Sequence, residues 1–478
     1  MVARVFDRLL ALLFLGAFLS LAVQIDVLIG SDGLMPIAPM VEALRGRPGV
    51  HFWDFPSLFW WNASDAFIHG GIWAGVLLAL LALAGAWPRL CFLLLVPLYL
   101  SYAVACRDFL SFQWDNLLLE CGFLAIALPR NRSARWIHLL FQVLLFKLYW
   151  ESGIAKWQSH LHDWQDGTAM TFYYETAPLP TWLAWYAHHL PEWWHHLESR
   201  GVLAFELLVP LCIFGPRFAR LFALAVFSGF QILNIATANY GLFCYAAFAL
   251  HMFLLDDRDI LHARGVFLRW WPGGPTSVRV ASAFGRYPLG RIASRTATIA
   301  LCIFFLGASL IEGVRRFGSV PEFRKRTASL RFYAPFRLVN NYHLFGHITR
   351  SRIEPEFQTL EGGTWSGHDL RYKPGPVDRA PPFIAPHQPR VDFRLWFYGL
   401  SSRHGPPRYV RTLLQRLCAN PDAVSTLFAG ELPEAPEAVR VAFWRYHFTT
   451  PEEREKTGAY WTRSWVRATP PTRCGGPS

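Results

Sequence analysis

The chain has 478 residues, of which 53% are hydrophobic and only 17% charged, and its mean hydropathy is +0.22. This hydropathy is high for a soluble protein, and the apolar residues are concentrated in blocks before residue 312. The formal net charge of +12 does not indicate nucleic-acid binding, because the basic residues lie between apolar blocks and form no compact stripe. The composition therefore excludes a wholly soluble, nucleic-acid-binding protein and favours a multi-pass membrane region followed by one soluble domain.

The apolar segments are candidates for membrane-spanning helices, because they approach the length of about 20 residues that crosses the hydrocarbon layer. In chain order they are Leu9–Ile29, Gly70–Trp87, Leu90–Cys106, Phe112–Leu128, Trp136–Trp150, Val202–Phe214, Phe218–Ala236, Asn239–Leu255 and Thr296–Ile311. Several are shorter than an upright span, so we expect some to be re-entrant or to extend into their polar flanks. We predict a multi-pass α-helical membrane protein of about nine spans.

Arginine is distributed unevenly between the loops that join these segments. One set of loops carries most of it, comprising Arg89, Arg130, Arg132, Arg135, Arg217, Arg220 and seven arginines from Arg258 to Arg295. The other set, 30–69, 107–111, 151–201 and 237–238, carries only Arg45, Arg47, Arg107, Lys156 and Arg200. Because cytoplasmic loops are enriched in Lys and Arg, we predict a cytoplasmic N-terminus. An odd number of spans then places the C-terminal domain outside, in a bacterial periplasm or a eukaryotic lumen.

The chain after the last apolar segment has a different pattern. A strand, a turn and a second strand are predicted at 352–361, Gly362–Trp365 and 368–373. A short helix is predicted at 409–418, and the alternation of residues 439–449 indicates another strand. We predict a C-terminal extramembrane β-rich, β-sandwich-like domain over residues 313–478, after a helical domain over 1–312. Cys418 and Cys474 both fall in this domain, and a disulfide between them is compatible with an oxidising compartment.

Ionisable side chains occur within the apolar segments, where burial is costly and function is the default expectation. Glu120, Lys147 and Glu206 lie inside segments, and Glu151 follows Lys147 by one helical turn, so these two are expected to pair. Two interpretations stay open. The groups tie helices together through hydrogen bonds and buried pairs, or they line a polar cavity between helices.

Residues 151–201 are too polar to cross a membrane and are rich in tryptophan, which favours the headgroup level. We predict an interfacial cap on the outer face. Its histidines are His160, His162, His188, His189, His195 and His196. Adjacent histidines point about 100° apart on a helix and do not form a ligand pair, so we expect no metal site. Motifs for serine hydrolases, zinc peptidases, P-loops and dinucleotide binding are absent from the sequence.

Four stretches of the sequence resemble the lipase maturation factor family, membrane proteins of the eukaryotic endoplasmic reticulum with many bacterial relatives. They are WDNLLLECGFLAI (114–126), YYET with PLPT and AWYAHHLPEWWHH (173–196), ANYGLF (238–243), and NNYHLFGHITR with YKPGPVDRAPPFIAPHQPRVDFRLWF (340–397). The resemblance implies a chaperone-like maturation factor whose client is a secreted lipase or another extracytoplasmic protein. Its expected location is a bacterial inner membrane with a periplasmic C-terminal domain, among membrane lipids and without a cofactor.

The resemblance also implies that the C-terminal domain contacts the client. The most distinctive stretch there is APHQPR, and its candidates for client binding are His387, Gln388, Arg390 and Asp392. The alternative interpretation is that these residues close a loop by hydrogen bonds onto the β-rich domain.

A second stretch resembles a motif of the HTTM domain found in the vitamin K-dependent γ-carboxylase. It consists of Gly153 and Lys156, followed by Asp163, Trp164 and Gly167. The resemblance implies an alternative function, a membrane enzyme for a lipid-soluble or quinone-type substrate with Lys156 as the catalytic base. The alternative interpretation is that the Lys156 side chain extends to the membrane–water interface or pairs with Glu151 or Asp163. The residues predicted to form the pocket or cap are Glu120, Lys147, Glu151, Asp163, Trp164, Gly167, Tyr173, Tyr174, Glu175 and Glu206.

Overall fold

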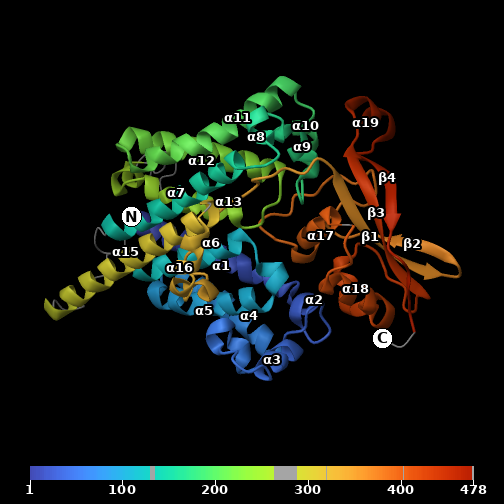
Figure 1. Ribbon diagram of the computed structural model, residues 1–478, viewed down its shortest axis with the longest axis horizontal. Coiled ribbons are helices and arrows are strands. Elements are labelled where there is room, and N and C mark those ends of the chain that lie inside the picture. Colours follow the sequence, from blue (N-terminus) through green and yellow to red (C-terminus); the bar gives the residue numbers. More distant parts are fainter. Residues whose placement is uncertain (130–134, 263–287, 319, 402, 476–478) are drawn as a thin grey trace, which may run out of the picture.

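A computed structural model describes residues 1–129, 135–262, 288–318, 320–401 and 403–475 (Figure 1). Several arginines that carry the predicted charge asymmetry lie outside the described residues, namely Arg130, Arg132, Arg264, Arg269, Arg279 and Arg286. A bundle of helices occupies one end of the molecule, and an antiparallel sheet with its own helices occupies the other (Figure 1).

Each of the apolar segments falls on a helix of the bundle. The longer helices are α1 (Val2–Ala22), α4 (Asp65–Ala84), α5 (Pro88–Ala105), α6 (Gln113–Ala127), α7 (Arg135–Trp157), α11 (Glu192–Leu208), α12 (Arg217–Thr237), α13 (Phe243–His251) and α15 (Pro288–Phe317). Among the described residues, five are long and apolar enough to cross a membrane: α1, α4, α5, α12 and residues 295–317 of α15. The others are shorter or more polar, because α6 has 15 residues and α13 only 9.

Local sequence explains where these helices begin and end. The hydroxyl of Ser64 accepts a hydrogen bond from the Phe67 N–H and caps α4. Gly85, at φ 84°, ends α4 in a left-handed conformation that costs glycine little. Pro88 then starts α5 at a position where the missing N–H is tolerated. The α4–α5 hairpin is therefore encoded by a few residues.

Short helices complete the bundle and its outer end. They are α2 (Ile25–Ile29), α3 (Ile37–Arg45), α8 (Asp163–Asp166), α9 (Ala169–Thr176), α10 (Trp182–His188) and α16 (Pro321–Arg326). The predicted cap corresponds to α8 to α10, with the end of α7 before it and the start of α11 after it. The cap also contacts the sheet domain, because the Trp185 indole N–H donates to the Thr449 carbonyl at 3.0 Å.

The C-terminal domain contains one antiparallel sheet of order β2-β1-β3-β4, with β5 also paired to β3. Its elements are β1 (Arg352–Glu361), β2 (Thr364–His368), α17 (Arg390–Leu400), α18 (Arg408–Ala419), β3 (Ala438–Phe448), α19 (Pro451–Thr457), β4 (Trp461–Ala468) and β5 (Thr472–Arg473). The turn is confined to Gly362 and Gly363, both at positive φ, so the second strand begins at Thr364 rather than His368.

The prediction of a β-sandwich-like domain was wrong for the described residues, which form a single sheet. Helices cover one face of this sheet in place of a second sheet: Tyr398 of α17 packs on Phe443 of β3 with ring centroids 5.3 Å apart. Strand alternation reveals that one face is buried but does not reveal whether a sheet or a helix covers it. The helix predicted at 409–418 is confirmed as α18, and a disulfide joins Cys418 to Cys474.

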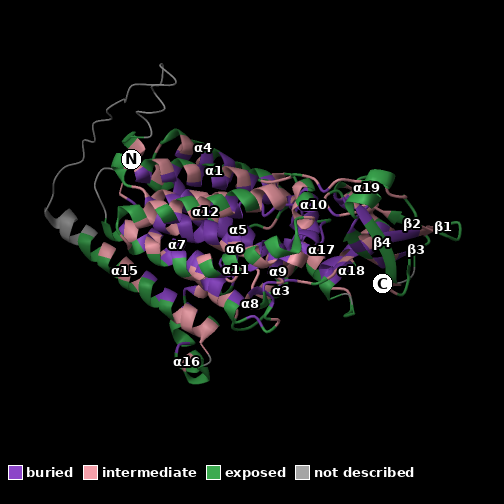
Figure 2. Cartoon of the chain, turned by 90° about the horizontal axis from the view of Figure 1, so that it is seen from above, coloured by how far each residue is buried: buried purple, intermediate pink, exposed green. Residues whose placement is uncertain are grey.

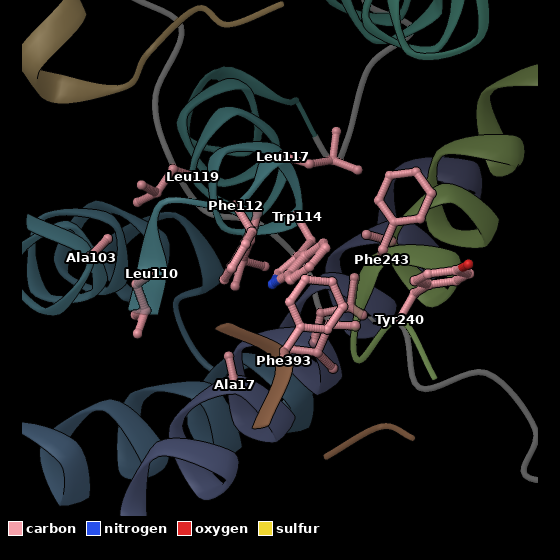
Figure 3. Close-up of a cluster of buried hydrophobic side chains, with 14 of the residues drawn as sticks. Ala17, Ala103, Leu110, Phe112, Trp114, Leu117, Leu119, Tyr240, Phe243 and Phe393 are labelled. Carbon is pink, nitrogen blue, oxygen red and sulfur yellow. The ribbon is translucent and has the colours of Figure 1, made fainter. Parts of the chain in front are cut away.

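The two halves share one continuous core. Buried positions run through the helix bundle and on into the C-terminal domain (Figure 2). Phe393 of α17 inserts beside the aromatic rings that precede and begin α6, at 4.9 Å from Phe112 and 5.0 Å from Trp114 (Figure 3). Burial of three large rings at one junction stabilises the docking of the C-terminal domain on the bundle.

The ends of the bundle differ in what they contact. At one end the N-terminal amine lies 2.6 Å from Asp257, and Arg220 pairs with Asp256 at 2.7 Å. At the other end the C-terminal domain contacts the predicted outer loops, for example through Arg416 and Asp32 at 3.0 Å. The loops that the arginine pattern assigns to the outer side therefore lie together beneath the C-terminal domain.

Candidate functional site

Residues 337–350 precede the first strand of the sheet and form no helix or strand. This connecting segment runs against the helix bundle, where each backbone N–H and C=O needs a partner. Arg337 anchors its start by donating to the carbonyl oxygens of Leu110 at 2.7 Å and Ala103 at 2.9 Å. The segment contains the NNYHLFGHITR string, in which Tyr342 and Ile348 are buried and His347 and Arg350 are exposed.

Glu120 of α6 is the central acceptor for the connecting segment. One carboxylate oxygen accepts from the Asn340 backbone N–H at 3.0 Å, from the Asn340 amide at 2.9 Å and from the Tyr342 hydroxyl at 2.8 Å. The other oxygen pairs with Lys147 at 3.0 Å. Glu120 is fully buried, and these four donors offset the cost of removing its charge from water.

The last turns of α7 and the residues just after it supply further contacts to the connecting segment. Glu151 accepts from the Tyr342 N–H at 2.7 Å, and Lys156 donates to the Leu344 carbonyl at 3.0 Å. The Ser159 hydroxyl lies 2.8 Å from Nδ1 of His347. The ionisable groups of the apolar segments therefore satisfy the backbone of an irregular segment, which extends the interpretation that they tie helices together.

Two expected ion pairs have different partners in the structure. Lys147 pairs with Glu120 rather than with Glu151, because Glu151 is turned toward the connecting segment. Lys156 pairs with Glu206 of α11 at 2.7 Å rather than with Glu151 or Asp163. Sequence spacing identifies neighbours on one helix but cannot identify a partner on a helix that packs across from it.

A cavity of about 390 Å³ opens beside this Lys156–Glu206 pair, between α7, α9, α11 and α12. Trp164, Tyr173 and Tyr174 also line it, so the structure brings together four of the residues predicted for the pocket or cap with Lys156, the candidate base. The remaining candidates Glu120, Lys147, Glu151, Asp163, Gly167 and Glu175 do not line this cavity. Most of its wall is apolar, with Leu, Val, Met and Phe side chains around a few hydroxyl and carboxylate groups.

Several polar groups on the cavity wall have hydrogen-bond partners. The hydroxyls of Tyr173 and Tyr240 contact each other, and the Tyr174 hydroxyl donates to Glu198 at 2.6 Å. The indole N–H of Trp164 donates to the Phe345 carbonyl at 3.1 Å, and its ring lies 5.1 Å below the Lys156 ammonium. The cavity thus adjoins the connecting segment, because Leu344 and Phe345 form part of its wall.

The other cap candidates have structural contacts. Asp163 pairs with Arg350 of the connecting segment at 2.5 Å. Gly167 ends α8 at φ 84°, where an added Cβ would lie 3.1 Å from the Arg200 side chain. Glu175 accepts from the Phe448 N–H at 2.9 Å and thereby joins the cap to β3. Among the described residues no group of histidine, cysteine and carboxylate side chains is arranged to hold a metal ion.

The APHQPR stretch is the main joint between the two halves. Arg390 is buried and binds both carboxylate oxygens of Asp115, at 2.7 and 2.8 Å. The Gln388 N–H donates to the Ser20 hydroxyl at 3.1 Å, and His387 contacts the same hydroxyl at 2.9 Å. Asp392 accepts from the Tyr372 N–H at 3.2 Å. This geometry supports the interpretation that the stretch closes a loop, onto both the bundle and the β-rich domain.

Sequence reasoning missed three residues that hold this joint. Arg352 of β1 is fully buried and donates to the carbonyl oxygen of Glu175 at 2.9 Å. Asn239 donates to Pro382 at 2.8 Å and accepts from Ile384 at 2.8 Å, and Gln24 donates to the Gln388 carbonyl at 2.9 Å. Of these three residues, only Asn239 could have been singled out from the sequence, because it lies within the ANYGLF string. Nothing in the sequence distinguishes Arg352 and Gln24 from ordinary strand and loop residues, because their partners belong to the other half of the molecule.

The fold and the site together define a class of protein. It is a helical membrane protein whose irregular connecting segment and C-terminal β domain are held on the bundle by buried polar contacts.

Comparison with known proteins identifies the family. The family model of the lipase maturation factor transmembrane domain matches residues 1–262, and that of the lipase maturation factor C-terminal domain matches residues 338–471. The chain belongs to the lipase maturation factor family.

Individual relatives match almost the whole chain. Lipase maturation factor 2 of Mus musculus is 30% identical over 95% of this chain and 80% of its own length, and that of Homo sapiens is 28% identical over the same shares. Lipase maturation factor 1 of Homo sapiens is 26% identical over 96% of this chain and 85% of its own length. No solved structure matches the chain.

Proposed function

We propose that this chain is a membrane-anchored, chaperone-like factor that assists the maturation of secreted lipases or related extracytoplasmic clients. The observation that carries the proposal is the match to relatives named lipase maturation factor over 95% of the chain, which includes the C-terminal domain. A sequence match that covers both halves supports a shared role better than a match to the membrane region alone would.

We place the client on the face of the sheet that α17 and α18 leave uncovered. Trp465 of β4 is 50% exposed there and packs against Trp444 at 5.3 Å. Arg463 stacks on Trp444 at 4.4 Å, and Arg440 stacks on Trp365 at 4.0 Å. Stacked Trp and Arg side chains are typical of interaction hot spots, because they bury much area and keep polar edges. This surface, defined by these five residues, is called the aromatic face below.

The earlier candidates at His387 to Asp392 are assigned a positioning role instead. A client cannot reach Gln388, Arg390 or Asp392 while the two halves are docked, since all three are buried. Lys156 is likewise assigned to holding the connecting segment, because its ammonium already donates to Glu206 and to the Leu344 carbonyl. A base would need a free lone pair, so this arrangement favours maturation over the quinone-directed alternative.

We further propose that all nine apolar segments contribute to the membrane region, with the shorter ones re-entrant or partly exposed at the outer end. The boundary at residue 312 then separates this region from an outer domain, in the periplasm if the source is bacterial. The Cys418–Cys474 disulfide supports an oxidising compartment.

The experiment measures lipase activity per unit of lipase protein in a host that lacks this chain, with and without co-expression. Wild type is expected to raise this specific activity. Trp465→Ala and Arg440→Ala are expected to lower it about tenfold without lowering the level of the factor, as when a hot spot of about 1.4 kcal/mol is lost.

Two comparison variants separate contact from folding. Trp136→Ala removes an exposed tryptophan from α7 at the opposite end of the bundle and should leave specific activity unchanged. Arg390→Ala should lower protein level and activity together, because it strands Asp115 without its partner. Unchanged specific activity across candidate lipases in the deletion host would contradict the proposed function.

A further inference from the structure

We propose that the cavity beside Lys156 and Glu206 binds one neutral, single-chain lipid whose polar end carries a hydroxyl group, such as a monoacylglycerol. This inference goes beyond lipase maturation and does not rest on it. The joint between the two halves and the aromatic face both lie outside this cavity, and neither of them requires it.

The position of the cavity mouth indicates that the ligand comes from the membrane. Leu197 and Gly201 of α11 and Leu233 of α12 line the cavity and are also exposed, the two leucines at 58% and 61%. They face outward between two helices, and α12 is one of those long and apolar enough to cross a membrane. A lipid chain can therefore enter sideways from the bilayer without passing through water.

The size of the cavity indicates a ligand with one hydrocarbon chain. Its volume of about 390 Å³ lies near the lower end of the range of roughly 300–1,000 Å³ that ligand sites occupy. Val202, Phe205, Val226 and Phe230 supply much of its apolar wall. Such a wall stabilises a hydrocarbon chain by removing it from water or from looser contacts in lipid.

The polar groups indicate the head group. Gln231 is fully buried on the cavity wall, its amide N–H donates to Tyr149 at 2.9 Å, and its carbonyl oxygen has no hydrogen-bond partner among the described residues. A buried acceptor without a donor is costly, and a ligand hydroxyl would satisfy it. The unpartnered amide oxygen of Gln231 therefore indicates a ligand whose hydroxyl group donates a hydrogen bond.

The charges on the wall indicate a neutral head. The Lys156 ammonium is already neutralised by Glu206 at 2.7 Å, and Glu198 adds a second carboxylate to the lining. A fatty-acid carboxylate or a phosphate would therefore meet more negative than positive charge in a site of low polarity. A hydroxylated neutral lipid meets no such repulsion.

The test uses the purified full-length protein and a monoacylglycerol that carries a photoreactive diazirine in its chain. After irradiation, labelled peptides are mapped by mass spectrometry. We expect saturable labelling of α11 and α12 around residues 197–206 and 226–237, and competition by unlabelled monoacylglycerol. A fatty acid and a phospholipid with the same diazirine chain should label these peptides at least tenfold less.

Matched glycine variants test the location. An added Cβ at Gly201 meets open space, so Gly201→Phe should fill the mouth without disturbing α11 and should reduce labelling at least tenfold. Gly229→Phe is the control, because Gly229 on α12 also faces open space but does not line the cavity. Leu233→Trp narrows the opposite side of the mouth and provides a second blocking variant if Gly201→Phe folds poorly.

Two results would overturn the inference. The first is that both blocking variants fold, with unchanged thermal unfolding midpoints, and are still labelled like wild type. The lipid would then bind on the outer surface of the helices rather than in the cavity. If the fatty acid labels the cavity peptides as well as the monoacylglycerol does, the neutral hydroxylated head is the wrong ligand class.

Discussion

At the scale of single residues, three buried carboxylates among the described residues each lie beside a cation. Glu120, Asp115 and Glu354 are buried carboxylates, and each contacts a cation: Lys147, Arg390 and Lys373 respectively. A buried pair of this kind is weak evidence for stability, because desolvation offsets much of the attraction. Its clearer consequence is specificity, since a misplaced segment would leave an unpaired charge in the interior.

Asp392 provides a prediction about pH. Burial raises the pKa of its carboxyl to about 6, although the Tyr372 N–H and the nearby Lys373 act in the opposite direction. An unfolded aspartate titrates near pH 4, so between about pH 4 and 6 the folded state holds a proton that the unfolded state has lost. The stability contributed by Asp392 is therefore fully present below about pH 4 and is lost as pH rises through 6.

The matched variant is Asp392→Asn, which keeps an acceptor for Tyr372 and removes the titration. Relative to this variant, the wild type should become less stable as pH rises from 4 to 7, by at most about 1.4 kcal/mol per pH unit. Thermal or denaturant unfolding of both proteins across this range measures the difference. Burial also lowers the pKa of His387 to about 4, but that group is present in both proteins and cancels. A pH-independent difference would contradict the raised pKa.

At the scale of elements, the connecting segment 337–350 explains much of the unusual polarity of α6 and α7. It forms no ladder of its own, so its backbone groups take side-chain partners from Glu120, Glu151 and Lys156. Two separate family-like strings, 114–126 and 340–350, therefore meet in space.

Glu120→Gln tests this arrangement. The amide would present N–H groups to donors and leave Lys147 buried without its counterion, which we expect to cost about 3–5 kcal/mol. The measurement is the thermal unfolding midpoint together with protease cleavage of the connecting segment, both of which should change.

Two further variants accompany Glu120→Gln. Glu192→Gln changes an exposed carboxylate on α11 and should leave both readouts unchanged. The double variant Glu120→Gln with Lys147→Met should recover part of the loss, because the unpaired charge is gone. A wild-type midpoint in Glu120→Gln alone would show that the carboxylate does not hold the segment.

At the scale of the whole molecule, the C-terminal domain is docked on the end of the bundle away from the N-terminus (Figure 1). Buried Arg352 and Arg390 cross the joint, and Phe393 fills it with apolar contact. Such a joint is unlike the small polar interfaces of freely moving domains. We therefore expect the bundle and the sheet to move as one unit.

The orientation in the membrane is a prediction that rests on the arginine pattern. Alkaline phosphatase fused after Cys474 is expected to be active in a bacterial host, because that enzyme needs the disulfides formed outside the cytoplasm. A fusion after Leu261, in a loop that the pattern places in the cytoplasm, should be inactive. The reverse pair of activities would contradict the orientation.

Much of the helical region could be predicted from the sequence, and the failures have physical causes. Apolar segments are local and long, so each of the candidates falls on a helix. Pairing is not local: Lys147 and Lys156 have partners on other helices, and the sheet is covered by helices rather than by a second sheet. Similarly, APHQPR is distinctive in sequence, but only its burial against Ser20 and Asp115 shows that it is a joint.

The sequence by itself determined the membrane class, the position of the helices, the presence of C-terminal strands and the family, because hydropathy and long family strings are properties of the chain. Only the tertiary structure decided which charges pair, where the connecting segment runs, and that a cavity remains beside Lys156. Those features depend on which surfaces meet after folding. Contacts between residues more than 100 positions apart, such as Glu120 with Tyr342, leave no periodic trace in the sequence.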